Sequence, residues 1–277
     1  MWLASQVVVV VPAWNEAPRI ERVLRGLPAW IDRVVIVDDA SADGTAEAAV
    51  AVGDPRISIV RHSNNRGVGA AIATGYRSAL SMGGAARDAF VIMAGDGQMD
   101  PDDLPALVDP LAAGRADYVK GTRFPRGPRG RPRGMPPARW LGGLAFSVAT
   151  SVAVGIRVSD SQCGYAAISR EACVALDLDA LWPRYGYPND LLSQLALRGM
   201  RIAEAPVRAV YADEVSRLKV RHVPVIAAIV ARAGWRRLGT AVPKTSPPPR
   251  SDPSRLTAAP QVPARGSRVH APARDRD

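Results

Sequence analysis

"VVVVVPAWNEAPRIERVLRGLPAWIDRVVIVDD", residues 7–39, is the stretch that decides the fold. Val7 to Val11 and Arg33 to Val37 are runs rich in β-branched residues, a pattern typical of strands that are buried on both faces. Apolar side chains recur at helical spacing between the two runs, at Ile20, Val23, Leu24 and Leu27, and Pro28 then ends the helical pattern. The stretch therefore predicts a strand, a helix and a second, parallel strand.

The same alternation continues along the chain. We expect further strands at 57–60, 89–94, 118–120 and 202–206, with helices near 69–82, 104–113 and 190–198 and from residue 140 onward. Alternating strands and helices predict an α/β fold with a mostly parallel central sheet and helices on both of its faces. In such a sheet the ligand lies at the carboxyl ends of the strands.

The composition excludes several classes of protein and leaves others open. A formal net charge of +10 suits a polyanionic partner, which could be nucleic acid, an anionic membrane surface or a phosphorylated substrate. The two cysteines lack the spacing of a disulfide framework or a zinc site, which favours a reducing, cytosolic setting. The first apolar run is too short for a secretory signal, and the uncharged stretch 140–156 is too short for a membrane-spanning helix.

The chain changes in character after residue 122. Residues 123–139 contain six arginines and five prolines and no acidic residue. An apolar stripe at helical spacing follows, at Leu141, Leu144, Ala145, Val148 and Val152. The pair of segments is interpreted either as a dock for a lipid phosphate or as a solvated loop beside a core helix.

Three parts of the chain are expected. Residues 1–215 should form the α/β domain. Residues 216–240 combine apolar and basic side chains, which suits either a helix at a membrane surface or a helix that packs on the sheet. Residues 241–277 are rich in proline and arginine and poor in apolar side chains, so we expect a disordered tail.

Acidic residues follow three of the predicted strands. They are Glu16, the pair Asp38 and Asp39, and Asp96. Any one of them could be a helix cap or a turn residue, but three successive strand ends favour a binding site. Asp96 and Gln98 flank a glycine, which lets two side-chain oxygens converge on a hard cation that also binds ligand phosphates. The first strand is not followed by a glycine-rich loop, which argues against classical dinucleotide and P-loop sites.

Five motifs, taken together, resemble those of a known enzyme family. They are "VVVVVPAWNEAPRIERVL", "VVIVDDASADGTAEAA", "HSNNRGVGAAIATGYRSAL", "VIMAGDGQMDPDDL" and "SDSQCGYAAISR". Their order and spacing resemble inverting family 2 glycosyltransferases with the GT-A fold, over roughly residues 6 to 215. Within that family the chain looks most like the dolichyl-phosphate mannose synthase and polyprenyl-phosphate sugar transferase group. Each motif alone is weak, and the set is specific.

The resemblance implies a site for a nucleoside diphosphate sugar over the strand ends. Three residues would border the nucleoside: Pro12, Trp14 and Glu16. Asp39 would hold the base, with Asp38 as a second candidate, and a loop would close over it with Asn65, Gly67 and Gly69. Asp96 and Gln98 match the metal motif of the family, with Mg²⁺ or Mn²⁺ between them and the diphosphate. Here the second carboxylate is replaced by an amide, which leaves Asp96 as the more critical ligand.

The acceptor is less well defined by the same resemblance. Asp190 falls near the catalytic acid of many members, and it is a candidate base or simply a residue that caps a helix. Arg123 suits a phosphate, and we group it with Asp96 and Asp190 as catalytic candidates. The acceptor-side motif of the family is matched by Asp160, Gln162 and Gly164, which could equally form a turn.

Three functions follow from these patterns. The first is transfer of a sugar from a uridine or guanosine diphosphate sugar to a polyprenyl phosphate, by a peripheral protein at the cytoplasmic face of a membrane. The second is a soluble transferase that acts on a sugar hydroxyl or a small metabolite with Asp190 as base. The third, which the retained Asp39 and Asp96 disfavour, is a non-catalytic adaptor that binds an anionic membrane or nucleic acid. Sequence-specific nucleic-acid binding is not expected, because the basic segments lack interleaved aromatic residues.

Overall fold

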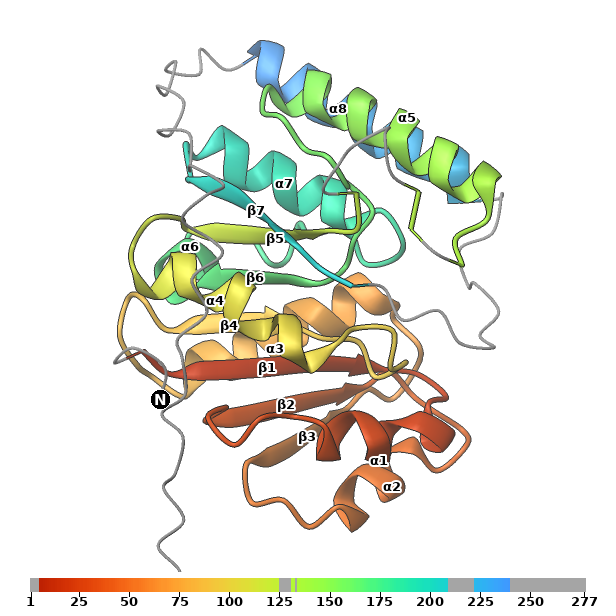
Figure 1. Ribbon diagram of the computed structural model, residues 1–277, viewed down its shortest axis with the longest axis vertical. Helices are drawn as coiled ribbons and strands as arrows, with labels where there is room; N and C mark the ends of the chain where they lie inside the picture. The colour runs from red at the N-terminus through yellow and green to blue at the C-terminus, as the bar shows by residue number, and fades with distance from the viewer. Residues whose placement is uncertain (1–4, 125–130, 133, 209–221, 240–277) are drawn as a thin grey trace, which may run out of the picture. The chain divides into compact units, whose positions relative to one another are not determined.

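A seven-stranded sheet with the strand order β3-β2-β1-β4-β6-β5-β7 forms the centre of the computed structural model (Figure 1). The strands are β1 (Val7–Ala13), β2 (Arg33–Asp38), β3 (Ile57–Arg61), β4 (Ala89–Ile92), β5 (Tyr118–Thr122), β6 (Ala166–Ser169) and β7 (Ile202–Pro206). β6 is antiparallel to both of its neighbours, β4 and β5, and every other pairing is parallel. The prediction of a mostly parallel sheet is confirmed.

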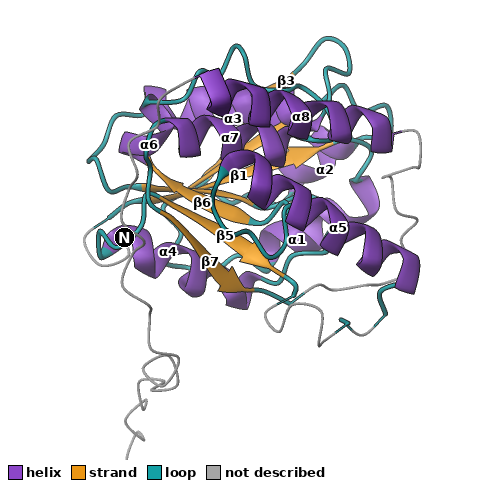
Figure 2. Ribbon diagram, turned by 90° about the horizontal axis from the view of Figure 1, so that it is seen from above, coloured by secondary structure: helices purple, strands orange, loops and turns teal. Residues whose placement is uncertain are grey.

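Helices cover both faces of this sheet. Figure 2 shows the sheet between two helical layers. One face carries α1 (Ala17–Arg25), α2 (Thr45–Ala51) and α4 (Leu104–Ala112), which follows a short 3₁₀ turn, and the other carries α3 (Val68–Ser81), α6 (Arg170–Val174) and α7 (Tyr187–Leu197). The structure describes residues 5–124, 131–132, 134–208 and 222–239.

The run of valines in β1 is explained by these two layers. Val7, Val9 and Val11 lie in the core under α1 and α4, whereas Val8 and Val10 lie in the core under α3 and α7. Because successive side chains of a strand point to opposite faces, a strand covered on both sides needs an apolar residue at every position.

Two more helices lie beyond α7. They are α5 (Pro137–Val154) and α8 (Val223–Gly239), which pack against each other and against α7 (Figure 1). The helical part of the predicted segment 216–240 therefore has packing partners in α5 and α7. Residues 216–221 and 240 lie outside the described residues, as do the tail 241–277 and much of the arginine-rich segment.

Two predicted element boundaries differ in the structure. The helix expected from residue 190 begins at Tyr187 and has Gly186 at its N-cap, so Asn189 and Asp190 lie within its first turn. The strand expected at 89–94 ends at Ile92, where β4 ends. Asp190 is therefore not the residue that caps α7.

Candidate active site

The carboxyl ends of β1, β2 and β4 meet at one edge of the sheet. Ala13 at the end of β1 lies opposite Asp38 at the end of β2. The backbone N–H of Asp39 donates to the Ala13 carbonyl at 2.9 Å, and that of Gly95 donates to the Pro12 carbonyl at 3.2 Å. The segments that contain Glu16, Asp38, Asp39 and Asp96 are thereby brought together, as expected for a crevice at the ends of parallel strands.

Asp39 is the centre of a buried hydrogen-bond cluster. Its carboxylate accepts from the backbone N–H groups of Arg66, at 2.9 Å, and of Gly67, at 2.7 Å. His62 Nδ1 lies 2.7 Å from the same carboxylate, and His62 Nε2 lies 3.0 Å from the hydroxyl of Thr74. Asp39 therefore fixes the loop 62–67. The sequence predicts no role for His62, because nothing in the sequence pairs His62 with Asp39.

Two glycines of the predicted closing loop touch a distant segment of the chain. A Cβ atom at Gly67 would lie 2.6 Å from the Pro183 carbonyl oxygen, and one at Gly69 would lie 2.1 Å from that of Trp182. Gly67 also has a φ of +97°, which favours glycine. The backbone N–H of Ala70 donates to the Pro183 carbonyl at 3.0 Å. The start of α3 is therefore held against residues 182–184.

The other predicted nucleoside residues surround this edge. Pro12 is buried within β1, and Trp14 is a large apolar side chain that stays exposed. Glu16 is buried and accepts from Arg19 Nη1 at 3.1 Å. The Asp38 carboxylate accepts from the Ser41 N–H at 3.0 Å, and Asn65 Nδ2 donates to the Asp39 carbonyl at 3.4 Å. These last side chains support loops, and Trp14 presents a surface to the solvent.

Asp96 and Gln98 form a tight turn that begins four residues after the end of β4. The Asp96 Oδ1 atom accepts the backbone N–H of Gln98 at 3.0 Å, and the intervening Gly97 has a φ of +75°. The three residues are partly exposed. Among the described residues, no group of three or more His, Cys, Asp or Glu side chains could hold a metal ion. One carboxylate at a strand end fits Mg²⁺ or Mn²⁺, because Mg²⁺ in nucleotide sites is held by one or two carboxylates and by substrate phosphates.

The predicted acceptor residues Arg123 and Asp160 form a bidentate ion pair. Arg123 Nε and Nη2 lie 2.7 and 2.9 Å from the two oxygens of Asp160, which is fully buried. Burial raises the pKa of Asp160, but the Arg123 guanidinium and the Lys120 ammonium outweigh burial and hold this pKa below its ordinary value. Asp160 is therefore a charged group that fixes Arg123 just beyond the end of β5.

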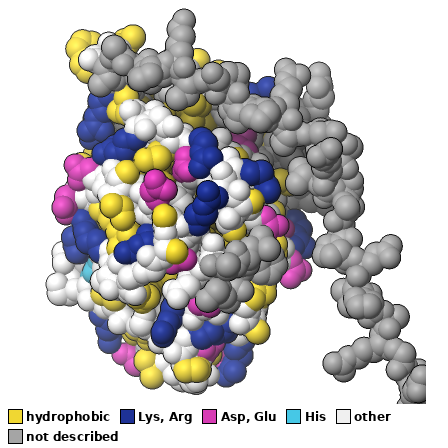
Figure 3. Space-filling view, turned by 90° about the vertical axis from the view of Figure 1, so that its left-hand side faces the viewer, with side chains coloured by type: hydrophobic (Ala, Val, Ile, Leu, Met, Phe, Trp, Pro, Cys, Tyr) yellow, Lys and Arg dark blue, Asp and Glu magenta, His cyan; other side chains and the backbone are white. Residues whose placement is uncertain are grey.

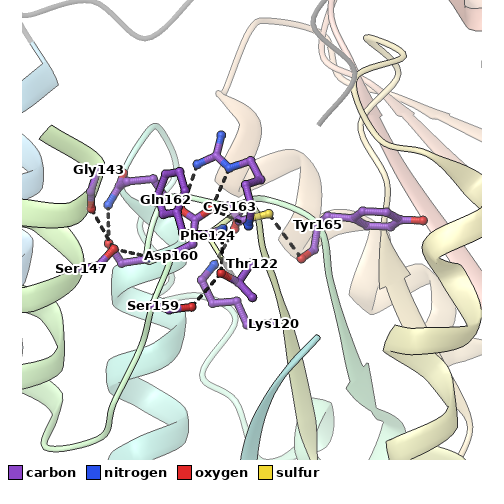
Figure 4. A network of polar contacts seen from close by, with 12 residues as sticks. Lys120, Thr122, Phe124, Gly143, Ser147, Ser159, Asp160, Gln162, Cys163 and Tyr165 are labelled. Atoms are coloured by element: carbon purple, nitrogen blue, oxygen red, sulfur yellow. Dashed lines mark hydrogen bonds and ion pairs between the residues drawn. The ribbon is translucent and has the colours of Figure 1, made fainter. Parts of the chain in front are cut away.

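A buried polar network supports this pair (Figure 4). Lys120 Nζ donates to the Cys163 carbonyl, and burial lowers the pKa of Lys120. The Ser161 N–H donates to the Ser147 hydroxyl at 3.0 Å, which attaches the loop after Asp160 to α5. Neither Lys120 nor Ser147 is expected at the site from the sequence. A lysine within a predicted strand of otherwise apolar residues, at the end of 118–120, is a signal that could have singled out Lys120.

Gln162 and Gly164 lie in the same loop. Gln162 Nε2 lies 3.4 Å from Asn189 Oδ1, which also accepts from the Thr150 hydroxyl at 2.8 Å. A Cβ atom at Gly164 would lie 3.0 Å from the Tyr187 hydroxyl oxygen. The acceptor-side motif is thereby brought against the first turn of α7 and the inner face of α5.

Asp190 is buried beneath α8, and both of its carboxylate oxygens have partners. Oδ2 accepts the Trp182 backbone N–H at 2.9 Å. Oδ1 lies 2.7 Å from Arg232 Nη2 and 3.5 Å from Arg236 Nη1, both on α8. Asp190 thus joins α7, α8 and the segment that contacts the start of α3.

Comparison with known proteins identifies the family. The model of the family described as "Glycosyl transferase family 2" matches residues 8–176, which contain the acidic strand ends and the Arg123–Asp160 pair. The chain belongs to glycosyl transferase family 2. This family 2 glycosyltransferase is 32% identical over 207 residues to "Undecaprenyl-phosphate mannosyltransferase" of Micrococcus luteus. The aligned region covers 73% of this chain and 82% of that protein.

Two further proteins show the same likeness. "UDP-N-acetylglucosamine--dolichyl-phosphate N-acetylglucosaminyltransferase" of Methanococcus voltae is 28% identical over 222 residues, covering 75% of this glycosyltransferase and 86% of that protein. The crystal structure of glucosyl-3-phosphoglycerate synthase from Mycobacterium tuberculosis in complex with uridine diphosphate has a TM-score of 0.60 and 26% identity, over 83% of this chain and 81% of that chain. The predicted GT-A fold and the predicted transferase class are confirmed.

Proposed function

We propose that this glycosyltransferase moves a sugar from a nucleoside diphosphate sugar, with inversion, to a phosphate oxygen of a polyprenyl phosphate. The observation that carries the proposal is that both carboxylate oxygens of Asp190 already have partners in the protein. A hydroxyl acceptor needs a base to take its proton, and Asp190 is the base that the sequence offers. Both of its oxygens are engaged, by the Trp182 N–H on one side and by Arg232 on the other.

A lipid phosphate removes the need for that base. Its oxygen is already ionised at neutral pH, so it can attack the anomeric carbon without losing a proton. The alternative, a hydroxyl acceptor with Asp190 as base, requires Asp190 to leave Arg232 and the interior of the protein. The arrangement of the described residues therefore favours the phosphate.

Arg123 is suited to receive that phosphate. A guanidinium binds phosphate oxygens through parallel N–H donors, and its planar shape makes the orientation important. The buried Asp160 carboxylate fixes this orientation from behind, at 2.7 and 2.9 Å. Gln162, in the loop that Asp160 begins, would help to line the sugar pocket.

The donor would lie over the ends of β1, β2 and β4. Asp39 orders the loop 62–67 and would hold the base, while the exposed Trp14 and the buried Glu16 would border the nucleoside. A divalent cation held by Asp96, with Gln98 as a neutral neighbour, would offset the negative charge that develops on the departing diphosphate. The acceptor oxygen must then approach from the side of the sugar opposite that diphosphate, which is what inversion requires.

The relatives support this choice of substrates. The Micrococcus luteus protein is named for transfer to undecaprenyl phosphate and the Methanococcus voltae protein for transfer from UDP-N-acetylglucosamine to dolichyl phosphate. The chain spans more than four fifths of each. We therefore propose that this protein uses a polyprenyl phosphate acceptor and lies on the cytoplasmic face of a membrane. The proposed donor is a uridine or guanosine diphosphate sugar.

The test is a partition assay. The purified protein is incubated with bacterial membranes, Mg²⁺ or Mn²⁺ and, one at a time, labelled UDP- and GDP-sugars, and the products are separated into organic and aqueous phases. The proposal predicts label in the organic phase for one donor, abolished by EDTA. Transfer to water-soluble products alone would support the hydroxyl-acceptor alternative and contradict the proposal.

A further inference from the structure

The helix α5 has its polar and apolar faces reversed. Two of its three buried residues, Ser147 and Thr150, are polar and the third is Val154, while Leu141, Val148 and Val152 are exposed. A helix on the surface of a water-soluble protein normally shows the opposite arrangement. The exposed fraction is 66% for Val148 and 73% for Val152, so these are not side chains at the border of the core.

The buried polar groups of α5 have a structural role. The Ser147 hydroxyl accepts the Ser161 N–H at 3.0 Å, and the Thr150 hydroxyl donates to Asn189 Oδ1 at 2.8 Å. The inner face of α5 therefore supports the loop that contains Asp160. This requirement explains why polar residues point inward, but it does not explain why large apolar residues point outward.

The end of α8 extends the outward apolar face. α8 buries Ile226 and Ile229, yet Trp235 is 80% exposed and Leu238 is 86% exposed. Arg237, next to Leu238, donates to the Val152 carbonyl of α5 at 2.9 Å, which places the ends of the two helices together. We call the exposed apolar side chains the α5–α8 surface: Leu141, Val148, Val152, Trp235 and Leu238. Figure 1 shows α5 and α8 side by side at the top of the molecule, and Figure 3 shows hydrophobic side chains at its upper edge as well as elsewhere on the same face.

The charge around this surface has one sign. Residues 118–159, which include α5, contain no Asp or Glu, and neither do residues 215–251, which include α8. The cations in and beside the two helices include Arg139, Arg157 and Arg237, whereas Arg232 and Arg236 of α8 face the buried Asp190. An apolar surface that is bordered by arginine and carries an exposed tryptophan has the chemistry of a contact with an anionic bilayer.

We propose that the α5–α8 surface docks on an anionic lipid bilayer, with Trp235 and Leu238 in the interface and the arginines among the headgroups. The proposal rests on the proposed function and adds its membrane partner and orientation. Among the described residues, no helix is long and apolar enough to span a bilayer. A second copy of the chain is a poorer occupant, because a symmetric contact would bring two sets of arginines together.

Docking in this orientation would bring the acceptor side to the lipid. The outer face of α5 contacts the bilayer, and its inner face, through Ser147, holds the loop that begins at Asp160 and orients Arg123. The phosphate of a membrane-bound polyprenyl chain would then reach Arg123 without leaving the headgroup region.

The test compares the full-length protein with W235S/L238S in flotation with vesicles. The matched control is V50S/V174S, which changes two other exposed apolar residues, Val50 on α2 and Val174 at the end of α6. We expect the wild type and the control to float with vesicles of phosphatidylglycerol and phosphatidylcholine, less in high salt and far less with phosphatidylcholine alone. The bound fraction of W235S/L238S should fall by about tenfold or more, because two large apolar side chains leave the interface.

Two further measurements keep the outcome interpretable. Thermal unfolding must show that W235S/L238S is folded, and transfer to a short, water-soluble prenyl phosphate should equal that of the wild type. Loss of flotation with this transfer retained supports docking. Flotation equal to the wild type overturns the docking proposal, as does a wild-type dimer that W235S/L238S converts to a monomer. Failure of the wild type to use any prenyl phosphate would instead contradict the proposed function and leave the flotation result standing.

Discussion

Arg232 on α8 lies 2.7 Å from the carboxylate of Asp190 on α7, where Asp190 is only 1% exposed. The pair connects a helix of the α5–α8 surface to the segment 182–184, which packs on the start of α3. This relationship gives Asp190 a role that does not require it to take a proton.

Asp190→Asn is expected to lower stability and to spare catalysis. The free energy of unfolding should fall by about 2 kcal/mol, less than the ~3–5 kcal/mol for a fully buried pair, because the Arg232 side chain is 39% exposed. Urea unfolding measures this change, and an Asp190–Arg232 double-mutant cycle isolates the coupling. Transfer to polyprenyl phosphate by the folded variant should stay within about tenfold of the wild type. A loss of ~100-fold or more with donor binding intact would identify Asp190 as a base.

Asp39→Asn is expected to weaken nucleotide binding. An amide cannot accept the N–H groups of Arg66 and Gly67 in the way the carboxylate does, so the loop 62–67 should lose its fixed position. Affinity for UDP or GDP, whichever the wild type binds in calorimetry with Mg²⁺, should fall by about tenfold or more. Asp54→Asn is the matched control: it breaks the ion pair with Arg56 before the amino end of β3 and should leave nucleotide affinity unchanged.

Gly69→Ala and Gly142→Ala should shift stability in opposite directions. A Cβ at Gly69 meets the Trp182 carbonyl oxygen at 2.1 Å, so the backbone must move, at a cost of about 1–3 kcal/mol or more. A Cβ at Gly142, inside α5, meets nothing within 4 Å, and alanine there should stabilise the helix by about 0.5–1 kcal/mol. Thermal unfolding of both variants checks the pair. Equal midpoints would show that α3 is not held against residues 182–184.

The Arg123–Asp160 pair should make the free energy of unfolding depend on pH in the acidic range. The pKa of Asp160 is lower in the folded protein than its ordinary value of 3.8, so its stabilising contribution is present above that value and is lost as pH falls through the folded pKa. The wild type should therefore exceed Asp160→Asn in unfolding free energy at pH 5 and above, and the difference should shrink below pH ~4. Urea unfolding of both proteins across this range measures it. A difference that does not change with pH would show that the pKa of Asp160 is the same in the folded and the unfolded protein, and that the pair with Arg123 adds no stability.

Gln98→Asp should tighten metal binding. A second carboxylate beside Asp96 adds a negative ligand for a hard cation, and the concentration of Mn²⁺ or Mg²⁺ that half-saturates transfer should decrease. Asp102→Asn changes an exposed carboxylate of the same segment and should leave this concentration unaltered. An unchanged metal requirement in Gln98→Asp would show that residue 98 does not face the ion.

The sequence could predict those features that depend on local pattern. The valines of β1 predict a strand covered on both faces because every position is apolar, and Asp38 and Asp96 were predicted at the crevice because parallel strands end at one edge. The stripe of Leu141, Val148 and Val152 predicts a helix with one apolar face. It does not say that this face is exposed, because that depends on which side of α5 meets the buried loop.

The sequence could not predict contacts between distant segments. His62 meets Asp39 across 23 positions, and Arg232 meets Asp190 across 42. No spacing rule relates such residues, because the packing of β2 beside β3 and of α8 on α7 brings them together. For this reason Asp190 was a candidate base in the sequence and an ion-paired residue in the structure.

The most direct measurement of the central claim uses a matched pair of acceptors. The purified protein in detergent is given the donor sugar with a polyprenyl phosphate or with the polyprenol of equal chain length, and the rate of label transfer is compared. Attack by an ionised phosphate oxygen, held by Arg123 and needing no base, predicts transfer to the phosphate and none above background to the alcohol. Comparable transfer to the alcohol, lost in Asp190→Asn, would contradict the account.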